Sequence, residues 1–154
     1  MRVLIIGNAG SGKTTMARAL CAAGGAVHLC LDDLAFAEGA LRRPLAESTA
    51  ALEGFIAEHD RWVIEGCYAD LAEGALPHCD EFRFLNPGVA ACIENCRRRH
   101  WEPDKFPTPE AQNDMLETLI AWVSDYETRG DEYGMARHRA LFDRFTGRKR
   151  EYTH

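Results

Sequence analysis

The chain has 154 residues, 46% of them hydrophobic, and a formal net charge of −6. This length and apolar content suit one domain with a core of its own, so we expect residues 1–154 to form a single domain. The acidic charge argues against nucleic acid as a partner, and no apolar run approaches the roughly 20 residues of a membrane helix, so we expect a cytoplasmic protein without a membrane partner.

The first apolar run leads directly into a phosphate-binding loop. Residues 3–6 predict a strand, residues 7–14 read GNAGSGKT and match the pattern G-x-x-x-x-G-K-[ST], and residues 15–20 favour a helix. Glycines let the backbone curl around a triphosphate with its N–H groups inward. No guanine-reading NKxD motif appears, which favours ATP. The expected nucleotide-binding residues are Gly7, Asn8, Ala9, Gly10, Ser11, Gly12, Lys13, Thr14 and Thr15.

Three side chains of this loop have expected tasks. Lys13 supplies a mobile charge for the β and γ phosphates, and the Thr14 hydroxyl is suited to ligating Mg²⁺. Thr15 is placed to assist at the α phosphate. The helix that opens near Lys13 adds the positive end of its dipole to the same site.

Strands alternate with helices along the rest of the chain, which predicts an α/β fold with a mainly parallel sheet flanked by helices. Ligands of such sheets lie at the carboxyl ends of the strands. Further strands are expected over residues 26–31, buried and ending at Asp32 and Asp33, over 61–66, ending at Glu65 and Gly66, over 81–85, and over 149–152 at an edge.

The helix expected over residues 89–99 leads into a proline-bearing segment, after which Thr108 and Pro109 should cap a long helix. Residues 97–109 suit a short lid that closes cations over a transferring phosphate. Shorter helices are expected over about residues 50–59 and 138–145.

Three consecutive arginines open this lid. Arg97, Arg98 and Arg99 point about 100° apart on a helix, so one or two of them should reach the site. Arg97 and Arg99 are the catalytic candidates, and the alternative is a solvated basic helix end. Arg137 and Arg139 are weaker candidates for the same role.

The strand-end carboxylates are the other catalytic candidates. Asp32 could hold Mg²⁺ through water or accept the proton of a hydroxyl acceptor, and the alternative is a helix cap. Glu65 stands where an acidic residue often organises magnesium-bound water, or it is a solvent-facing turn residue. Gly66 fits a close approach of substrate or a tight turn. Asp33, Glu65 and Gly66 are therefore counted as substrate-binding candidates.

Arg42 and Arg43 follow the second strand. An arginine there could bind an anionic group of an acceptor through two parallel hydrogen bonds, and Arg43 is the candidate taken forward. The simpler alternative is that both arginines are exposed loop residues without a binding role.

The six cysteines form no CxxC pair, and most lie in apolar or helical stretches. We expect reduced, buried thiols rather than disulfides or a metal site. The residues are Cys21, Cys30, Cys67, Cys79, Cys92 and Cys96.

The phosphate loop at 7–14, Leu31-Asp32 and the segment 62–66 resemble the small P-loop kinases, the superfamily of adenylate, shikimate and gluconate kinases. The chain is most similar to bacterial members labelled adenylate-kinase-like or FlaR-like (DNA topology modulation). The resemblance covers most of the chain, although the phosphate loop is its one highly specific motif. It implies a P-loop NTPase fold of three layers around a five-stranded parallel core, use of ATP and Mg²⁺, an acceptor region at about 33–60 and a lid at about 97–109.

The resemblance also implies roles residue by residue. Lys13 and Thr14 carry the triphosphate and magnesium, Asp32 the acidic role at the strand end with a share in the metal, and Arg97 or Arg99 the lid role. The chain departs from its relatives in having a Glu-Gly pair after the third strand where many carry Asp-Gly, and a lid too short for that of the long adenylate kinases. No adenine-binding motif is evident near the tail.

Three classes of function remain open at this point. A kinase that moves the γ-phosphoryl of Mg-ATP to a small-molecule or nucleotide acceptor needs an acceptor before it turns ATP over. A nucleotide-dependent regulatory ATPase binds tightly and hydrolyses slowly. A polynucleotide-end kinase binds DNA or RNA in a salt-sensitive way. The lid arginines and the strand-end carboxylates favour the first, and the net acidity disfavours the third.

Overall fold

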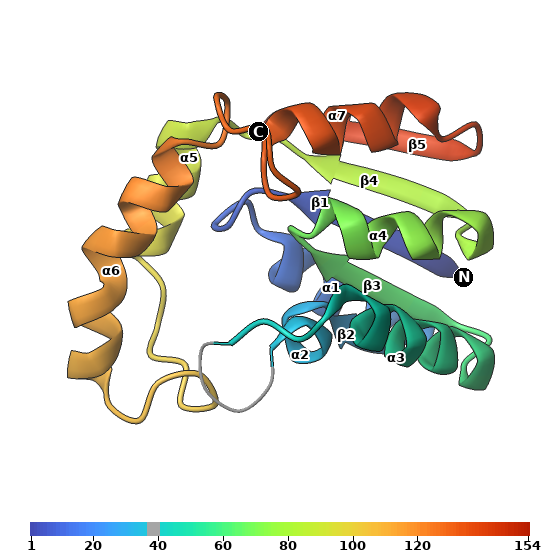
Figure 1. Cartoon of the computed structure of the whole chain (residues 1–154), viewed down its shortest axis with the longest axis horizontal. Helices are drawn as coiled ribbons and strands as arrows, with labels where there is room; N and C mark the ends of the chain where they lie inside the picture. Colours follow the sequence, from blue (N-terminus) through green and yellow to red (C-terminus); the bar gives the residue numbers. More distant parts are fainter. Residues whose placement is uncertain (37–40) are drawn as a thin grey trace.

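A computed structural model describes residues 1–36 and 41–154 of the chain (Figure 1). The part of the predicted acceptor region at 37–40 lies outside the described residues. The strands are β1 (Arg2–Gly7), β2 (Val27–Cys30), β3 (Trp62–Gly66), β4 (Glu81–Leu85) and β5 (Arg148–Tyr152). The helices are α1 (Lys13–Gly24), α2 (Asp32–Ala35), α3 (Leu45–Glu58), α4 (Ala69–Ala75), α5 (Val89–Arg97), α6 (Pro109–Ser124) and α7 (Met135–Arg144), with a 3₁₀ turn η1 (Leu76–His78).

The five strands form one sheet in the order β2-β3-β1-β4-β5, and every neighbouring pair is parallel. Parallel strands require crossover connections, and helices of the chain supply them. The predicted α/β fold with a parallel sheet flanked by helices is therefore confirmed. All five carboxyl ends lie along one edge, so the ends of β1, β2 and β3 bring the phosphate loop, Asp32 and Glu65 to the same side.

The central strands are apolar on both faces because helices cover both faces. In β1, Leu4 and Ile6 point to the face covered by α3, α4 and α7, and Val3 and Ile5 point to the face covered by α1 (Figure 1). All four side chains are at most 2% exposed. This packing fixes the position of β1 and, through it, the start of the loop that follows.

The second strand was predicted to be buried, and this is wrong. β2 lies at the edge of the sheet, so it pairs with a neighbouring strand, β3, on one side only. Val27 is 41% exposed, and the other three residues of the strand are half-buried. The strand also ends before Leu31, so Asp32 and Asp33 open the short helix α2 instead of ending the strand.

The remaining elements lie close to their predicted positions. Thr108 caps α6 as predicted, with its Oγ1 accepting the N–H of Ala111 at 3.1 Å and Pro109 at the first helical position. The helix and edge strand predicted for the tail are α7 and β5. No helix was predicted over residues 69–75, where α4 packs small side chains against the sheet.

The helices α5 and α6 form a hairpin beyond the carboxyl edge of the sheet (Figure 1). They share a small apolar cluster of their own, built on Cys92, Cys96 and Val123. All six cysteines are free, as predicted, but only Cys92 and Cys96 are fully buried. In the described parts of the chain, none of the helices is both long and apolar enough to cross a membrane.

Candidate functional site

The phosphate loop runs from the end of β1 into the first turn of α1. Gly10 and Gly12 take left-handed backbone conformations, with φ of +79° and +96°, which glycine adopts at little cost. Lys13 is only 9% exposed, and its Nζ donates to the carbonyl of Asn8 at 2.7 Å. The ammonium group thus folds back onto the backbone of its own loop.

The α5–α6 hairpin supports this loop from outside the sheet. The side-chain amide of Asn8 donates to the carbonyl of Val123 at 3.2 Å, and that of Asn95 donates to the carbonyl of Gly10 at 2.8 Å. The approach is so close that a Cβ on Gly10 would lie 2.4 Å from the carbonyl oxygen of Cys92. The conformation of the loop therefore depends on a contact with α5 as well as on its own glycines.

Glu65 is the acidic residue that faces the loop. Its Oε1 accepts from the Thr14 hydroxyl at 3.1 Å and lies 3.1 Å from Nε2 of His28, and the residue is 1% exposed. Burial alone would raise the pKa of Glu65, but the hydrogen bonds of His28 and Thr14 and the charge of Lys13 outweigh it and lower the pKa below its ordinary value. Glu65 is therefore an anion at neutral pH, and it is Glu65 rather than Asp32 that contacts the Thr14 hydroxyl.

Asp32 lies at the same edge but in a different environment. Tyr68 donates its hydroxyl to Oδ1 of Asp32 at 2.6 Å, and Nζ of Lys105 lies 3.4 Å from Oδ2. Burial opposes the charged form, but Tyr68, Lys105 and Lys13 together lower the pKa of Asp32. Lys105 belongs to the segment between α5 and α6, so an ion pair joins the predicted lid to the predicted acceptor side.

The structure separates the three arginines of the lid. Arg97 pairs with Glu117 of α6 at 3.1 Å, and Arg98 pairs with Glu94 on its own helix at 2.6 Å. Arg99 lines a cavity beside the loop, together with Lys105. Of the three, Arg99 is the one that lines this cavity.

The two arginines of α7 differ as well. Arg139 makes a bidentate contact with Glu151 of β5, at 2.8 and 2.7 Å, and lies over the ring of Phe84. Arg137 is exposed. Neither has a described contact with the phosphate loop.

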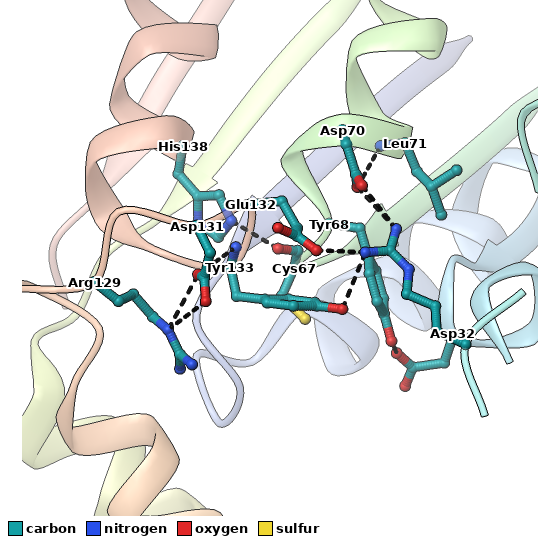
Figure 2. Close-up of polar contacts among 11 residues, drawn as sticks. Asp32, Cys67, Tyr68, Asp70, Leu71, Arg129, Asp131, Glu132, Tyr133 and His138 are labelled. Carbon is teal, nitrogen blue, oxygen red and sulfur yellow. Dashed lines mark hydrogen bonds and ion pairs between the residues drawn. The ribbon is translucent and has the colours of Figure 1, made fainter. Parts of the chain in front are cut away.

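Arg42 is the centre of a polar network that joins three distant segments. Figure 2 labels its partners Asp70, Glu132 and Tyr133. Its Nη2 donates to both carboxylate oxygens of Asp70, and its Nη1 donates to Glu132 and Tyr133. The guanidinium lies 5.2 Å from the ring centre of Tyr68, the residue that holds Asp32. Two carboxylates already neutralise Arg42, so it is a positioning residue for Tyr68 rather than a ready anion site.

The remaining candidates on the acceptor side are Arg43, Asp33 and Gly66. Arg43 uses its backbone N–H on the carbonyl of Ala35 at 2.7 Å, and its side chain is half-buried. Asp33 is exposed on α2. A Cβ on Gly66 would come within 2.8 Å of the Leu31 side chain, so packing against this residue, which lies between β2 and α2, is enough to require glycine there.

His138 is a buried residue that the sequence analysis missed. Its Nε2 donates to the carbonyl of Cys67 at 2.8 Å, and its Nδ1 accepts from the Tyr126 hydroxyl at 2.7 Å. Burial lowers the pKa of His138 to about 4, so the ring is neutral. It ties α7 to Cys67, the residue between β3 and Tyr68 (Figure 2).

No protein-family model matches the chain, and no curated protein matches its sequence. Among solved structures it is similar to TT1252 from Thermus thermophilus, with a TM-score of 0.55 and 16% identity over 99% of this chain and 88% of that one. It is also similar to a gluconokinase from Sinorhizobium meliloti 1021, with a TM-score of 0.48 and 18% identity over 93% and 97% of the two chains. A third similarity is to deoxyadenosine kinase from M. mycoides with bound dATP, with a TM-score of 0.46 and 11% identity over 86% and 88%. At these identities the first similarity shows a shared fold alone, so an activity has to be argued from the site.

Proposed function

We propose that the protein is an ATP-dependent phosphotransferase that moves the γ-phosphoryl group of Mg-ATP to a hydroxyl acceptor. The observation that carries the proposal is the pair formed by the phosphate loop and Glu65, which meet through the Thr14 hydroxyl at 3.1 Å. An anionic carboxylate on a loop threonine, with a lysine ammonium inside the loop, is the donor set that a magnesium triphosphate requires.

The residues of the phosphate loop fit a bound magnesium triphosphate. Ser11 Oγ is buried and has no hydrogen-bond partner among the described residues, and the N-terminus of α1 opens at Lys13 in the same loop. A phosphate oxygen would satisfy that hydroxyl and would lie at the positive end of the helix dipole. Thr14 and Glu65 would hold Mg²⁺, directly or through water, and the ion would supply charge neutralisation at the β and γ phosphates.

Asp32, on the side of the phosphate acceptor, would receive the proton. The acceptor hydroxyl oxygen bonds to the γ phosphorus as the bond from that phosphorus to the β–γ bridging oxygen breaks. ADP leaves with the bond electrons, and the hydroxyl proton passes to Asp32. The low pKa of Asp32 suits a proton that leaves late, since the transition state of such transfers is loose. Tyr68 orients this carboxylate, and Lys105 and Arg99 supply positive charge from the lid.

A nucleotide-dependent regulatory ATPase is the second candidate. The observation in its favour is the ion pair between Asp32 and Lys105, which occupies the carboxylate that a kinase would offer to its acceptor. A switch of this kind would bind Mg-ATP, hydrolyse it slowly and ignore every acceptor.

The test is label transfer from γ-labelled ATP with Mg²⁺ to pooled acceptors: nucleoside monophosphates, hydroxy acids, sugars, antibiotics, hydrophobic alcohols and oligonucleotides. We expect transfer to one pool, and loss of transfer in Lys13→Ala. Tight Mg-ATP binding without transfer to any pool would contradict the kinase and favour the switch.

A further inference from the structure

A cavity of about 340 Å³ lies between α5, the lid segment and α6. Most of its wall is apolar, and Phe106, Met115, Leu119 and Trp122 contribute to it. The volume falls within the range of small-molecule pockets, near its lower end. Nothing in the proposed phosphate chemistry uses this apolar wall, because a triphosphate needs polar donors.

The cavity adjoins the phosphate loop at one end. Cys96, which lines the cavity, lies so close to the loop that a Cβ on Gly10 would approach its Sγ to 2.8 Å. Ala9, the neighbour of Gly10, packs against the apolar cluster of the α5–α6 hairpin, which includes Leu119 and Trp122. The cavity is therefore separated from the outer side of the loop by little more than the side chain of Cys96.

Charged side chains of the lid segment also line the cavity. Two of them are Lys105 and Arg99, and Nζ of Lys105 lies 3.4 Å from the carboxylate of the proposed proton acceptor, Asp32. A hydroxyl group on an apolar body in the cavity can thus approach Lys105, the ion-pair partner of Asp32.

Two exposed apolar side chains lie beside this cavity. Met115, which lines it, is 50% exposed. Trp101 of the lid segment is 43% exposed, and its Nε1 donates to the carbonyl of Phe106, another lining residue, at 3.0 Å. Apolar side chains grouped at the mouth of a site are typical of a binding surface for an apolar ligand.

From these observations we infer that the acceptor is a small hydrophobic alcohol, whose aromatic or alkyl part occupies the cavity between α5 and α6 and whose hydroxyl faces Asp32. The inference rests on the proposed phosphotransferase function. It excludes polyhydroxy acids and free sugars as good acceptors, because their hydroxyl groups would lose water against an apolar wall that offers few partners.

The probe is 2-(4-bromophenyl)ethanol, whose bromine quenches tryptophan fluorescence on contact. The full chain is titrated with it in the presence of Mg-ATP. We expect saturable quenching that is strongly reduced in Trp122→Phe, and competition by 2-phenylethanol but not by D-gluconate. In the transfer assay, label should reach 2-phenylethanol and not gluconate.

A charge placed at the mouth of the cavity tests the location. Met115→Glu should weaken binding of the probe about tenfold or more, because the apolar body would have to desolvate a carboxylate. Met115 is half-exposed, so the fold should tolerate the change. Asn113→Glu adds the same charge to the exposed surface of α6 outside the cavity and should leave binding unchanged.

Absence of saturable quenching in a protein that still binds Mg-ATP would overturn the inference and leave the phosphotransferase proposal standing. Label transfer to gluconate or a sugar would do the same. Failure of the wild-type chain to bind Mg-ATP would instead overturn the phosphotransferase proposal itself.

Discussion

The two sides of the candidate site are built in different ways. On the nucleotide side, Lys13 and Glu65 are 9% and 1% exposed and are held by buried hydrogen bonds. On the acceptor side, the side chains of Asp32 and Lys105 are 37% and 42% exposed and meet in an ion pair at 3.4 Å. Exposed ion pairs contribute little free energy, so the acceptor side can rearrange at small cost while the nucleotide side stays preorganised.

The largest effect should follow from removing the ammonium on the preorganised side. Lys13→Ala should lower turnover about 10²- to 10³-fold, the usual cost of losing one donor to transition-state charge. Initial rates of label transfer measure it. Lys149→Ala removes another of the three lysines, one that contacts carbonyls of α7 far from the loop, and should retain wild-type turnover. Equal losses in both variants would show that the loop lysine has no special role.

A substitution at the contact between the phosphate loop and α5 should disturb the conformation of the loop. Gly10→Ala should lower the free energy of unfolding by roughly 3 kcal/mol, because alanine is strained at φ +79° and its Cβ would clash with the carbonyl of Cys92. Urea unfolding measures the change. Gly54→Ala, in open space on α3, should instead stabilise the protein by about 0.5–1 kcal/mol. A neutral Gly10→Ala would mean that α5 does not support the loop.

The acceptor side depends on His138, which hydrogen-bonds the carbonyl of Cys67, the residue before Tyr68. The pKa of His138 is about 4 when folded and has an ordinary value of 6.5, so between these values the unfolded chain binds the extra proton. Its contribution to stability is complete above pH 6.5 and is lost as the pH falls toward 4. The free energy of unfolding should drop by about 2 kcal/mol from pH 7 to pH 5 on this account.

His138→Gln provides the comparison, because its amide can keep both hydrogen bonds without titrating. Urea unfolding of this variant at the two pH values should show a drop smaller by the same amount. An unchanged pH dependence would indicate that the pKa of His138 is the same in the folded and the unfolded chain, and would contradict this account.

The smallest effects should separate the lid arginines. Arg99→Ala should slow transfer about tenfold, the size of one charge-assisted contact, because Arg99 lines the cavity proposed for the acceptor. Arg97→Ala breaks an exposed pair with Glu117 and should change transfer less than about twofold. The reverse order would mean that the lid turns its other face inward when it closes.

The sequence predicted the features that depend on neighbouring residues. The phosphate loop, the parallel strands and the Thr108 cap are local patterns, and the structure contains each of them. The contacts around Asp32 could not be predicted, because they join segments far apart in the chain. Lys105 is 73 residues from Asp32, and Tyr68 is 36. The burial of β2 was mistaken for a related reason, since an apolar run does not reveal whether a strand lies at an edge.

The central claim is that the two carboxylates have separate tasks, with Glu65 serving the magnesium triphosphate and Asp32 serving the acceptor. Calorimetric titration with ATP, with and without Mg²⁺, tests it in the wild type, Glu65→Gln and Asp32→Asn. The account predicts that Mg²⁺ strengthens ATP binding in the wild type and in Asp32→Asn but not in Glu65→Gln. Loss of the Mg²⁺ effect in Asp32→Asn, with the effect retained in Glu65→Gln, would contradict it.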